Sequence, residues 1–590
     1  MARTVADQII EVLIQAGVRR IYGLVGDSLN PIVDAVRRSG GAAAGGIDWI
    51  HVHNEEAGAL AAAAEAQLTG ALAVCAGSCG PGNTHLVQGL YDAHRSGAPV
   101  LAIASHIPSL QIGTNYFQET HPERLFVECS SWVELISRPE QMPRLQRIAM
   151  QTALADRGVS VLVLPGDITA LPAAHPTGRG DLVAPSSVVQ PAPDRVEALA
   201  EHINRARTVT LFVGAGVREA RDEVLALAER IGSPVGHSLG GKEWIQYDNP
   251  YDVGMSGLLG YGACFEASHS AELLVLLGTD FPYDGFLPQT RTVQVDRDAR
   301  HLGRRTVLDL GVEGDVGATL RALLPLVEEK TDRTFLEEML RHHADALEHV
   351  VDAYTRRVED HRPVHPEYVA SVLDDELDDD AVVTVDTGMC NVWAARYITP
   401  TGRRRIIGSF RHGTMANALL HAIGAAVSHR DVPGGRQVVS MSGDGGLTML
   451  MGELLTAAEQ DLDLTVVAFN NGSLGMIRLE MMVAGFPSFQ TDHGPADLGA
   501  IARASGLHAV TVADPQELRG ALRSALDHRG PALVDVRTDP NALSIPPHIT
   551  AEQVRGFALA GMRTVLAGGV GKMVDLARSN LRSVPRHPLR

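Results

Sequence analysis

Short apolar runs alternate with helical stretches along the first third of the chain. The runs RIYGLV, ALAVCAG, PVLAIAS and SVLVLPGD end at Gly, Ser or Asp. This alternation is the βαβ pattern of a mostly parallel sheet covered by helices. It recurs twice, first with TVTLFVG, ELLVLLG and TVQVD, and then with VVTVD, QVVSMSG, LTVVAFN and ALVDV. The sequence therefore predicts an α/β protein of three doubly wound parallel-sheet domains.

Changes in composition mark the boundaries between these domains. A Pro- and Gly-rich stretch of low periodicity runs from residue 171 to 193, and a charged helical stretch covers residues 327–361. Pro and Gly interrupt both helices and strands, so the first stretch is typical of a linker. We predict domains at 1–182, 190–335 and 345–535, and a helical C-terminal tail at 536–590.

Composition narrows the possible partners. The 590-residue chain has 45% hydrophobic residues and a formal charge of -19, which opposes a general attraction to nucleic acid. Its five cysteines are scattered and form no CxxC pair, which disfavours a disulfide framework or a zinc site and indicates a reducing compartment. The N-terminus has no signal-peptide pattern, and no run of about 18 apolar residues predicts a membrane span.

The clearest chemical signal is a Gly-Asp-Gly-Gly turn at residues 443–446. It ends the predicted strand QVVSMS, and Asn471 ends the next predicted strand, LTVVAFN, one helix later. Ligands bind at the carboxyl ends of parallel strands in open α/β sheets. Asp444, Asn471 and a backbone carbonyl near Ser473 offer the oxygen ligands that Mg²⁺ prefers, and the glycines let backbone N–H groups approach a diphosphate. An Asp-Gly turn alone is common, so the Asn after one crossover helix is what makes the pattern specific.

This combination resembles the thiamine-diphosphate enzymes, and the resemblance runs nearly end to end. It includes CAGSCGPGN, LAIASHIP, YFQETHP, RGVSVLVLPGD, KEWIQYDNPYDVGM, ATLRALLPLVEEK and VWAARY. These segments are most similar to the pyruvate oxidases, and among them to the quinone-reducing pyruvate dehydrogenases. The resemblance implies thiamine diphosphate, Mg²⁺ and FAD as cofactors. It also implies a pyrimidine-binding first domain, an FAD-binding central domain and a diphosphate-binding third domain.

Glu55 is the candidate activating acid. In the resembling enzymes a glutamate hydrogen-bonds N1' of the coenzyme pyrimidine and favours the tautomer that removes the C2 proton of the thiazolium. Glu55 is the first acid of HVHNEEAGALAAAAEA and matches that residue. Without the resemblance, it is equally well explained as an acid interacting with the positive end of a helix. Glu56 is the second candidate.

Other segments are expected to surround the coenzyme. Met415 resembles the bulky wedge that bends the cofactor, although Met at helical spacing also fills cores. The loop containing Gly80–Gly82 and His85 resembles the one that lines the reacting end, and Phe117, Gln118 and Phe126 are expected to face pyruvate and flavin. In the third domain the implied coenzyme contacts are Gly413, Thr414, Met415, Asp444, Gly445, Gly446, Asn471, Gly472, Ser473, Leu474, Gly475, Met476 and Ile477.

Evidence for a flavin lies in the central domain. Gly214 and Gly216 begin a dinucleotide-type turn, but Glu219 replaces the third glycine of GxGxxG, so that fingerprint is weak. Three separated segments resemble the FAD-binding segments of pyruvate oxidases, with Asp296 placed to accept hydrogen bonds from the adenosine side. The implied contacts are Ser256, Gly257, Leu258, Leu259, Thr279, Asp280, Phe281, Pro282, Tyr283 and Asp296.

One position departs from the resembling enzymes. They have Phe where this chain has Met476, and that Phe is thought to assist electron transfer to flavin. Met is flexible and fills similar space. Glu480, four residues later, keeps the acid of the family on the same helical face.

The tail contains a basic amphipathic segment, GGVGKMVDLARSNLRSVPRHPLR. Such a helix can lie in a membrane interface, and in the resembling enzymes it binds lipid after flavin reduction. The alternative is an oligomer-packing helix. The apolar positions are Met573, Val574, Leu576, Ala577 and Leu581, and the basic ones include Lys572, Arg578 and Arg582.

The resemblance implies oxidative decarboxylation of pyruvate to acetate and CO2, with electrons passing through FAD to a membrane quinone. It implies a homotetramer with active sites shared between subunits, located in the cytoplasm and peripherally on the inner face of the cell membrane. Two alternatives remain. An acetolactate synthase uses the same cofactors for carboligation, and a non-catalytic regulator retains only cofactor binding.

Overall fold

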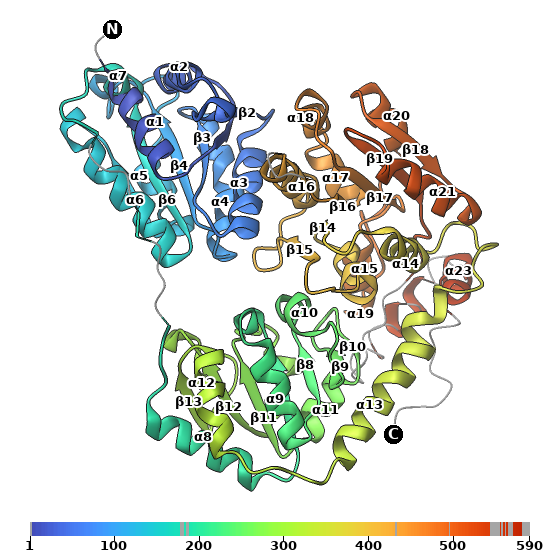
Figure 1. Ribbon diagram of the computed structural model, residues 1–590. Coiled ribbons are helices and arrows are strands. Elements are labelled where there is room, and N and C mark those ends of the chain that lie inside the picture. Colours follow the sequence, from blue (N-terminus) through green and yellow to red (C-terminus); the bar gives the residue numbers. More distant parts are fainter. Residues whose placement is uncertain are drawn as a thin grey trace.

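A computed structural model describes the chain at residues 3–177, 182–183, 188–430, 434–494, 496–542, 555, 558–560, 562–564 and 570–580. Three sheets dominate it, each with helices on both faces (Figure 1). The N-terminal and C-terminal sheets lie side by side, and the central sheet lies below them in this view. The predicted fold class of three parallel-sheet α/β domains is confirmed. The predicted domain boundaries stay predictions.

The N-terminal sheet has six parallel strands in the order β2-β1-β3-β4-β6-β5. Its central strands are Val/Ala/Leu-rich and buried on both faces, as strands between two helical layers must be. The strands are β1 Arg20–Gly23, β2 Asp48–His51, β3 Ala73–Gly77, β4 Val100–His106, β5 Trp132–Leu135 and β6 Val159–Pro165. The helices are α1 Val5–Gln15, α2 Asn30–Ser39, α3 Glu55–Thr69, α4 Pro81–Arg95, α5 Pro122–Leu125, α6 Met142–Asp156 and α7 Gly166–Ala170.

The C-terminal sheet has the order β15-β14-β16-β17-β19-β18, which is the same topology counted from its first strand. Its strands are β14 Val382–Val385, β15 Arg405–Gly408, β16 Val438–Gly443, β17 Thr465–Asn470, β18 His508–Val512 and β19 Ala532–Arg537. Its helices are α14 Pro366–Glu376, α15 Met389–Tyr397, α16 Asn417–His429, α17 Asp444–Met449, α18 Glu453–Glu459, α19 Gly475–Val483, α20 Leu498–Ala504 and α21 Pro515–Leu526. In both sheets the strand order reverses between the first and third strands, which is where open α/β sheets bind ligands.

The central sheet has seven strands in the order β10-β9-β8-β7-β11-β12-β13, with an antiparallel β9–β10 pair at one edge. Its strands are β7 Val209–Val213, β8 Val235–His237, β9 Asp252–Met255, β10 Tyr261–Gly262, β11 Leu273–Leu277, β12 Arg291–Asp296 and β13 Leu310–Glu313. Its helices are α8 Pro193–Arg205, α9 Arg221–Ile231, α10 Leu239–Ile245, α11 Cys264–Ser270 and α12 Val316–Leu323. Helix α13, Thr334–Ala346, then leads toward the C-terminal domain (Figure 1).

The N-terminal and C-terminal domains share one hydrophobic core where α3 packs against α16. Both helices are rich in Ala, so their backbones approach closely, and a Cβ added at Gly424 would lie 2.1 Å from the carbonyl oxygen of Ala61. Beside this contact, Nε2 of His421 lies 3.2 Å from Oδ2 of Asp92, and both side chains are fully buried. The two domains are therefore packed as tightly as a single core.

The central domain contacts the C-terminal domain through its β9–β10 edge. Met255 and Tyr261 belong to the same buried cluster as the strands of the C-terminal sheet. Arg396 donates a hydrogen bond of 3.2 Å to the carbonyl oxygen of Gly260, and Arg405 pairs with Glu243 at 3.0 Å. The central segment expected to bind flavin therefore lies against the third domain.

The described part of the tail docks on the C-terminal domain. In α23, Val570–Asn580, Leu576 is buried in a small cluster with Ala560 and with Met482 of α19. The Oγ of Ser579 donates a 2.6 Å hydrogen bond to Asp539. Side chains of Lys572, Met573, Ala577, Leu581 and Arg582 lie outside the described residues.

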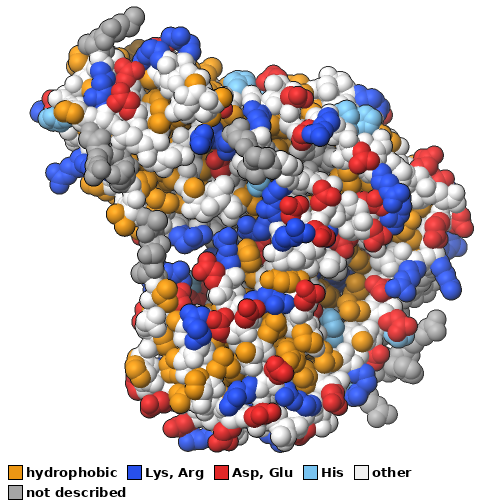
Figure 2. Space-filling model, viewed as in Figure 1, with side chains coloured by type: hydrophobic (Ala, Val, Ile, Leu, Met, Phe, Trp, Pro, Cys, Tyr) orange, Lys and Arg blue, Asp and Glu red, His pale blue; other side chains and the backbone are white. Residues whose placement is uncertain are grey.

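The distribution of surface charge and the state of the cysteines are consistent with the composition of the chain. On the face shown in Figure 2, basic and acidic side chains are interspersed. All five cysteines are buried free thiols. Within the described ranges, no helix has the length and apolar character needed to cross a membrane.

The α3–α16 contact gives a stability prediction. Gly424→Ala forces a Cβ against the Ala61 carbonyl, so we expect a loss of about 1–3 kcal/mol and a lower apparent melting temperature. Gly520→Ala is the matched control, because Gly520 of α21 has open space at its Cβ position. We expect this variant to be more stable than the wild type by about 0.4–1 kcal/mol. Differential scanning calorimetry measures both. Equal melting temperatures for Gly424→Ala and the wild type would contradict the close backbone contact.

Candidate active site

Asp444 and Asn471 lie at the carboxyl ends of neighbouring strands β16 and β17. The carboxylate of Asp444 accepts hydrogen bonds from the backbone N–H groups of Gly445, at 2.8 Å, and Gly472, at 2.6 Å. Oδ1 of Asn471 accepts from the N–H of Ser473. The structure therefore places both predicted metal ligands on the adjacent turns that follow β16 and β17. Asn470, by contrast, uses its amide on Ala496 and Asp535 inside the domain.

The turn after Asn471 is fixed by a facing segment. The N–H of Leu474 donates to the carbonyl of Thr491, and the N–H of His493 donates to the carbonyl of Gly472. The hydroxyl of Ser473 is used on Thr491 and Asp492, so only its backbone oxygen is available as the predicted third ligand. That oxygen accepts from the N–H of Gly475 in this structure.

The donor set around Asp444 fits a divalent cation. Burial raises the pKa of the Asp444 carboxyl, although its backbone hydrogen bonds oppose that shift. In the described part of the chain, the only ion-pair partner of Asp444 is His493, whose Nε2 lies 3.6 Å from Oδ1 and is buried without a hydrogen bond. A nearly buried carboxylate without Lys or Arg is stabilised by a bound cation. These residues would hold Mg²⁺ together with the diphosphate.

Asp386 lies at the candidate site but is not indicated by the sequence motifs. It follows β14, across the strand-order reversal from Asp444, and a Cβ added at Gly446 would lie 1.8 Å from its Oδ2. It accepts hydrogen bonds from the N–H of Thr387 and from Nδ2 of Asn417. Burial raises the pKa of the Asp386 carboxyl to about 7. The available signal was its position at the end of the strand VVTVD.

The loop before α16 positions Met415. Gly413 and Ala416 have left-handed backbone angles, with φ of 79° and 68°, and the hydroxyl of Ser409 accepts from the N–H groups of Gly413 and Thr414. Met415 is half-buried, and its Cε lies 3.5 Å from a Cβ built at Gly445. The predicted wedge therefore faces the diphosphate turn. A non-glycine residue such as Ala416 at positive φ is strained and is held there by its surroundings.

Glu55 is the first residue of α3, directly after the N-cap Asn54. It is 4% exposed, and its Oε2 lies 2.9 Å from Nδ1 of His85 on α4. A Cβ at Gly82 would lie 2.7 Å from Oε1, so glycine is needed beside the carboxylate. Burial raises the pKa of the neighbouring Glu56, which is less buried than Glu55. Among the described residues, no hydrogen bond or ion pair joins Glu55 to Asp444 or Met415.

Helix α4 connects the two halves of the candidate site. Gln88 lies one turn after His85 and donates a 2.8 Å hydrogen bond to the hydroxyl of Thr414. Its Oε1 lies 3.2 Å from Nε2 of His412. The helix that contacts Glu55 therefore also contacts the loop carrying Met415.

The central segments form a second candidate cofactor surface. The backbones of Gly216 and Gly278 approach so closely that a Cβ on Gly216 would lie 2.6 Å from the Cα of Gly278. Ser256 is buried with an unpaired hydroxyl, which fits a ligand that supplies a hydrogen-bond partner. Oδ1 of Asp296 accepts from the N–H of Asp298 and lies 3.2 Å from Nδ1 of His301. These features fit the expected flavin nucleotide.

The remaining central residues divide between core and surface. Thr279 and Phe281 are buried, Gly257 has φ of 107° beside Phe281, and Asp280 is paired with Arg304 and Arg305. The more exposed members of the predicted set are Leu258, Pro282 and Tyr283, with Leu259 partly buried. Burial, and to a lesser extent the charge of Glu480 on α19, raise the pKa of Tyr283.

The predicted pyruvate-facing residues are not brought together in one pocket. Phe117 is 77% exposed, whereas Phe126 is fully buried in the core shared by the N-terminal and C-terminal domains. Phe126 therefore fills the core and does not line an open surface, which corrects the expectation for its side chain. Gln118 has φ of 62° and accepts a hydrogen bond from Sγ of Cys79. Met476 packs partly buried against the C-terminal core, and Ile477 is exposed.

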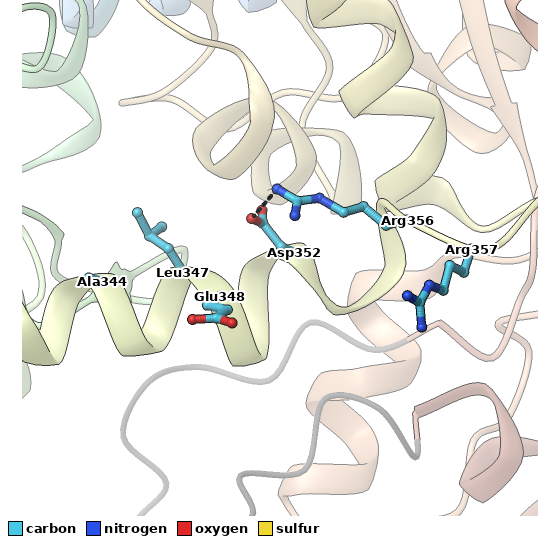
Figure 3. Close-up of a pocket in the computed structure, with 6 residues that line it drawn as sticks. All are labelled: Ala344, Leu347, Glu348, Asp352, Arg356 and Arg357. Carbon is cyan, nitrogen blue, oxygen red and sulfur yellow. Dashed lines mark ion pairs between the residues drawn. The ribbon is translucent and has the colours of Figure 1, made fainter.

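A surface pocket lies away from these residues, after α13 (Figure 3). Arg356 and Asp352 form an ion pair of 3.5 Å at this pocket, and the Arg356 side chain is highly exposed. Pairs of this kind contribute little energy. The pocket contains none of the predicted site residues; it is lined by Ala344, Leu347, Glu348, Asp352, Arg356 and Arg357.

Models of the thiamine pyrophosphate enzymes match all three domains. The N-terminal TPP binding domain matches residues 3–125, the central domain matches 196–323, and the C-terminal TPP binding domain matches 386–536. The first and third matches contain Glu55 and the Asp444–Asn471 pair, respectively. The chain belongs to the thiamine pyrophosphate enzyme family.

Relatives with different names cover most of the chain. "Putative thiamine pyrophosphate-containing protein YdaP" of Bacillus subtilis is 33% identical over 98% of this chain and 99% of that protein. Pyruvate oxidase of Lactiplantibacillus plantarum is 29% identical over 80% of this chain and 77% of that protein. The acetolactate synthase isozyme 2 large subunit of Escherichia coli is also 29% identical, over 90% and 95%. Similarity therefore assigns the family and leaves the reaction open between two named activities.

Asp386 gives a pH prediction. Its folded pKa of about 7 exceeds its ordinary value of 3.8, so the native state binds the extra proton between these values. Its contribution to stability is full below pH 3.8 and is lost as pH rises to about 7. The Asn side chain of Asp386→Asn does not titrate. As the pH rises from about 5.5 to about 8, the free energy of unfolding of the cofactor-free variant should therefore fall by about 2 kcal/mol less than that of the wild type.

Thermal unfolding of both cofactor-free proteins across this pH range measures the difference. The comparison depends on the change with pH, so any constant cost of the amide cancels. Parallel stability curves for the variant and the wild type would show that Asp386 is ionised throughout.

Proposed function

We propose that the chain decarboxylates pyruvate oxidatively to acetate and CO2, using thiamine diphosphate, Mg²⁺ and FAD, and passes the electrons to a membrane quinone. The observation that carries the proposal is the position of α19. This helix begins at Gly475, directly after the Asn471 turn, and the charge of its Glu480 raises the pKa of Tyr283 on the expected flavin surface. One helix thus spans from the diphosphate turn to the central domain, which suits electron transfer between two cofactors.

Glu55 is assigned the acid–base role. Its carboxylate is nearly buried and has His85 as its polar side-chain neighbour, so it is placed to hold a proton at N1' of the coenzyme pyrimidine. Bound thiamine diphosphate supplies the nucleophile and the electron sink for decarboxylation. Met415 would support the bound coenzyme from the side of the diphosphate turn, and Asp444 and Asn471 would hold the cation.

Met476 and the central surface are assigned to electron transfer. Bound FAD supplies a two-electron acceptor. Met476 is the second residue of α19 and packs only partly, so it would have room to adjust when both cofactors are bound. The unpaired hydroxyl of Ser256 is assigned to the flavin nucleotide.

The tail is assigned a regulatory role at the membrane. Its described part packs through Leu576 and Ala560 on Met482, which belongs to the same helix as Met476. Release of the tail would therefore expose apolar surface on α19 and change the environment of that helix. This supports reversible lipid contact, quinone access, and a cytoplasmic protein that is peripheral on the inner face of the cell membrane. A homotetramer with shared sites agrees with the absence of a described contact between Glu55 and Asp444 within one chain.

Acetolactate synthase-type carboligation is the second candidate, because the two named relatives are equally identical to the chain. In that reaction the flavin is redox-idle. A non-catalytic regulator is disfavoured by the retained Glu55, Asp444 and Asn471 and by the burial of Glu55 beside His85.

The test is product analysis of the holoenzyme with pyruvate, a soluble ubiquinone analogue and phospholipid vesicles. We expect acetate and reduced quinone in equal amounts, with little acetolactate. Glu55→Gln should lower turnover by about 10²- to 10⁴-fold, because it removes one acid–base group. Glu56→Gln is the matched control and should retain turnover within a few fold. Acetolactate as the main product, with quinone unreduced, would favour carboligation.

A further inference from the structure

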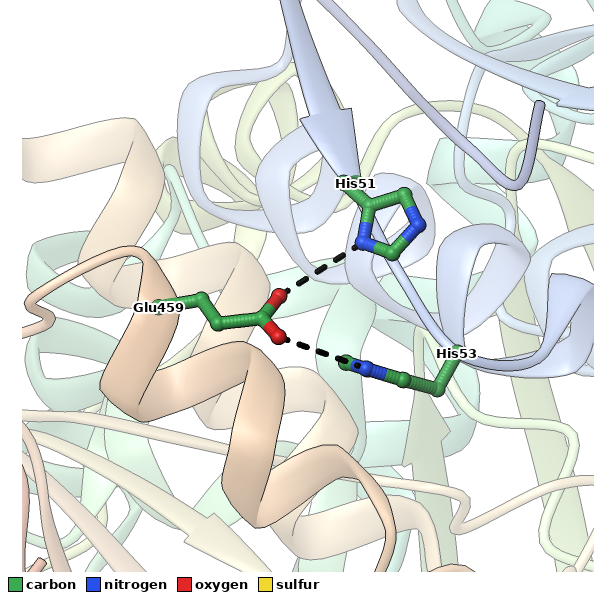
Figure 4. A group of neighbouring side chains, drawn as sticks. All are labelled: His51, His53 and Glu459. Carbon is green, nitrogen blue, oxygen red and sulfur yellow. Dashed lines mark ion pairs between the residues drawn. The ribbon is translucent and has the colours of Figure 1, made fainter. Parts of the chain in front are cut away.

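A second metal site is assigned by a cluster at the junction of the N-terminal and C-terminal domains. We propose that His51, His53 and Glu459 bind a borderline divalent transition cation such as Zn²⁺, which ties the entrance of α3 to the end of α18. The two histidines flank the end of β2, and Glu459 is the last residue of α18 (Figure 4). This site is separate from the Asp444 centre, and the proposal does not depend on the reaction.

The distances favour a shared cation over direct ion pairs. Nδ1 of His51 lies 3.6 Å from one carboxylate oxygen of Glu459, and Nε2 of His53 lies 3.5 Å from the other. Charge-assisted N–H···O bonds are normally about 2.7–2.9 Å long. Ligands at about 2.0–2.1 Å from a tetrahedral Zn²⁺ are separated by about 3.3–3.5 Å. The three candidate ligand atoms all lie within 4.8 Å of one another.

A hydrogen-bond chain places a proton on Nδ1 of His53. The hydroxyl of Thr456 lies 2.6 Å from Oε2 of Glu453 and donates its proton to that carboxylate. It is therefore the acceptor in its 3.0 Å contact with Nδ1 of His53. The neutral ring then carries its proton on Nδ1 and presents the Nε2 lone pair to Glu459. A lone pair facing a carboxylate is unfavourable unless a metal cation lies between them or Nε2 also carries a proton.

The hydrogen bonds from His53 to Thr456 and from Thr456 to Glu453 resemble those that support the ligands of metal sites. Metal-binding histidines commonly give their other N–H to an oxygen acceptor, which sets the tautomer and the ring orientation. Glu453 also accepts the backbone N–H of His53 at 3.0 Å, so the backbone beside the ligand is held as well. The ring of His53 is thereby held by Thr456 and its backbone by Glu453, both of which belong to α18.

The ligand types select the cation. Two imidazole nitrogens and one carboxylate suit Zn²⁺ and similar ions, whereas Mg²⁺ and Ca²⁺ prefer sites made only of oxygen. The three side chains are 38%, 32% and 50% exposed, which leaves room for a water as a fourth ligand. Three protein ligands plus water is an ordinary zinc arrangement.

The location gives the site a structural consequence. His53 precedes the N-cap Asn54 and the first helical residue, Glu55. A cation held by β2 and α18 would therefore fix the segment that orients Glu55 relative to the C-terminal domain. It would add to the α3–α16 contact as a second connection between the domains.

The direct test is a ZnCl2 titration of metal-depleted full-length protein, with thiamine diphosphate and excess Mg²⁺ present to fill the diphosphate site. We expect one Zn²⁺ per chain that Mg²⁺ does not displace. His51→Gln and Glu459→Gln should each weaken binding by at least about tenfold. His342→Gln is the matched control, because His342 pairs with Glu266 at 2.9 Å with similar exposure. It should bind Zn²⁺ like the wild type.

Thr456, which accepts the hydrogen bond from His53, allows a second test of Zn²⁺ binding. Thr456→Val should weaken Zn²⁺ binding by about 10- to 100-fold, and Thr456→Ser should restore it. Zn²⁺ should raise the melting temperature of the wild type but not that of Glu459→Gln. The proposal is overturned if no stoichiometric Zn²⁺ binds, or if His51→Gln and Glu459→Gln bind it as tightly as the wild type. Binding without a change in melting temperature would overturn the connecting role.

Discussion

The packing of α3 against α16 is the contact on which the rest of the site depends. Both helices are Ala-rich, and at Gly424 the lack of a side chain lets one backbone touch the other. Close packing of this kind transmits small displacements, because protein interiors have few voids. Two residues of the candidate site lie at the starts of these helices. Glu55 is the first residue of α3, and Met415 lies two residues before Asn417, the first residue of α16. The helix pair therefore sets the frame in which the acid and the wedge are placed.

The two coenzyme-binding domains share one topology but use it differently. In the C-terminal domain the strand-order reversal places Asp386 and Asp444 on either side of a glycine turn, and burial raises the pKa of both. The glycine turn between these two acids is suited to bind a divalent cation together with a diphosphate. In the N-terminal domain the equivalent sheet places a nearly buried Glu55 beside His85. In the proposed reaction, one sheet thus serves cation and diphosphate binding and the other serves proton transfer.

The sequence predicts the three sheets well, because buried parallel strands appear as continuous Val/Ala/Leu runs with turns after them. Asp444 and Asn471 are also predictable, since strand ends and glycine turns have local signatures. Asp386, His493 and the His51–His53–Glu459 cluster are not, because their partners lie on strands or helices distant in sequence. Phe126 shows the opposite problem: an aromatic near a motif was expected at the pocket but packs in the core. Long-range packing decides such cases, and no local pattern records it.

In the proposed reaction, decarboxylation is joined to flavin reduction across α19. The most direct measurement is an anaerobic titration of the FAD-loaded holoenzyme with pyruvate, followed by flavin absorbance without any quinone. We expect about one equivalent of pyruvate to bleach one flavin, since each decarboxylation delivers two electrons to it. Consumption of pyruvate with the flavin remaining oxidised would contradict the account.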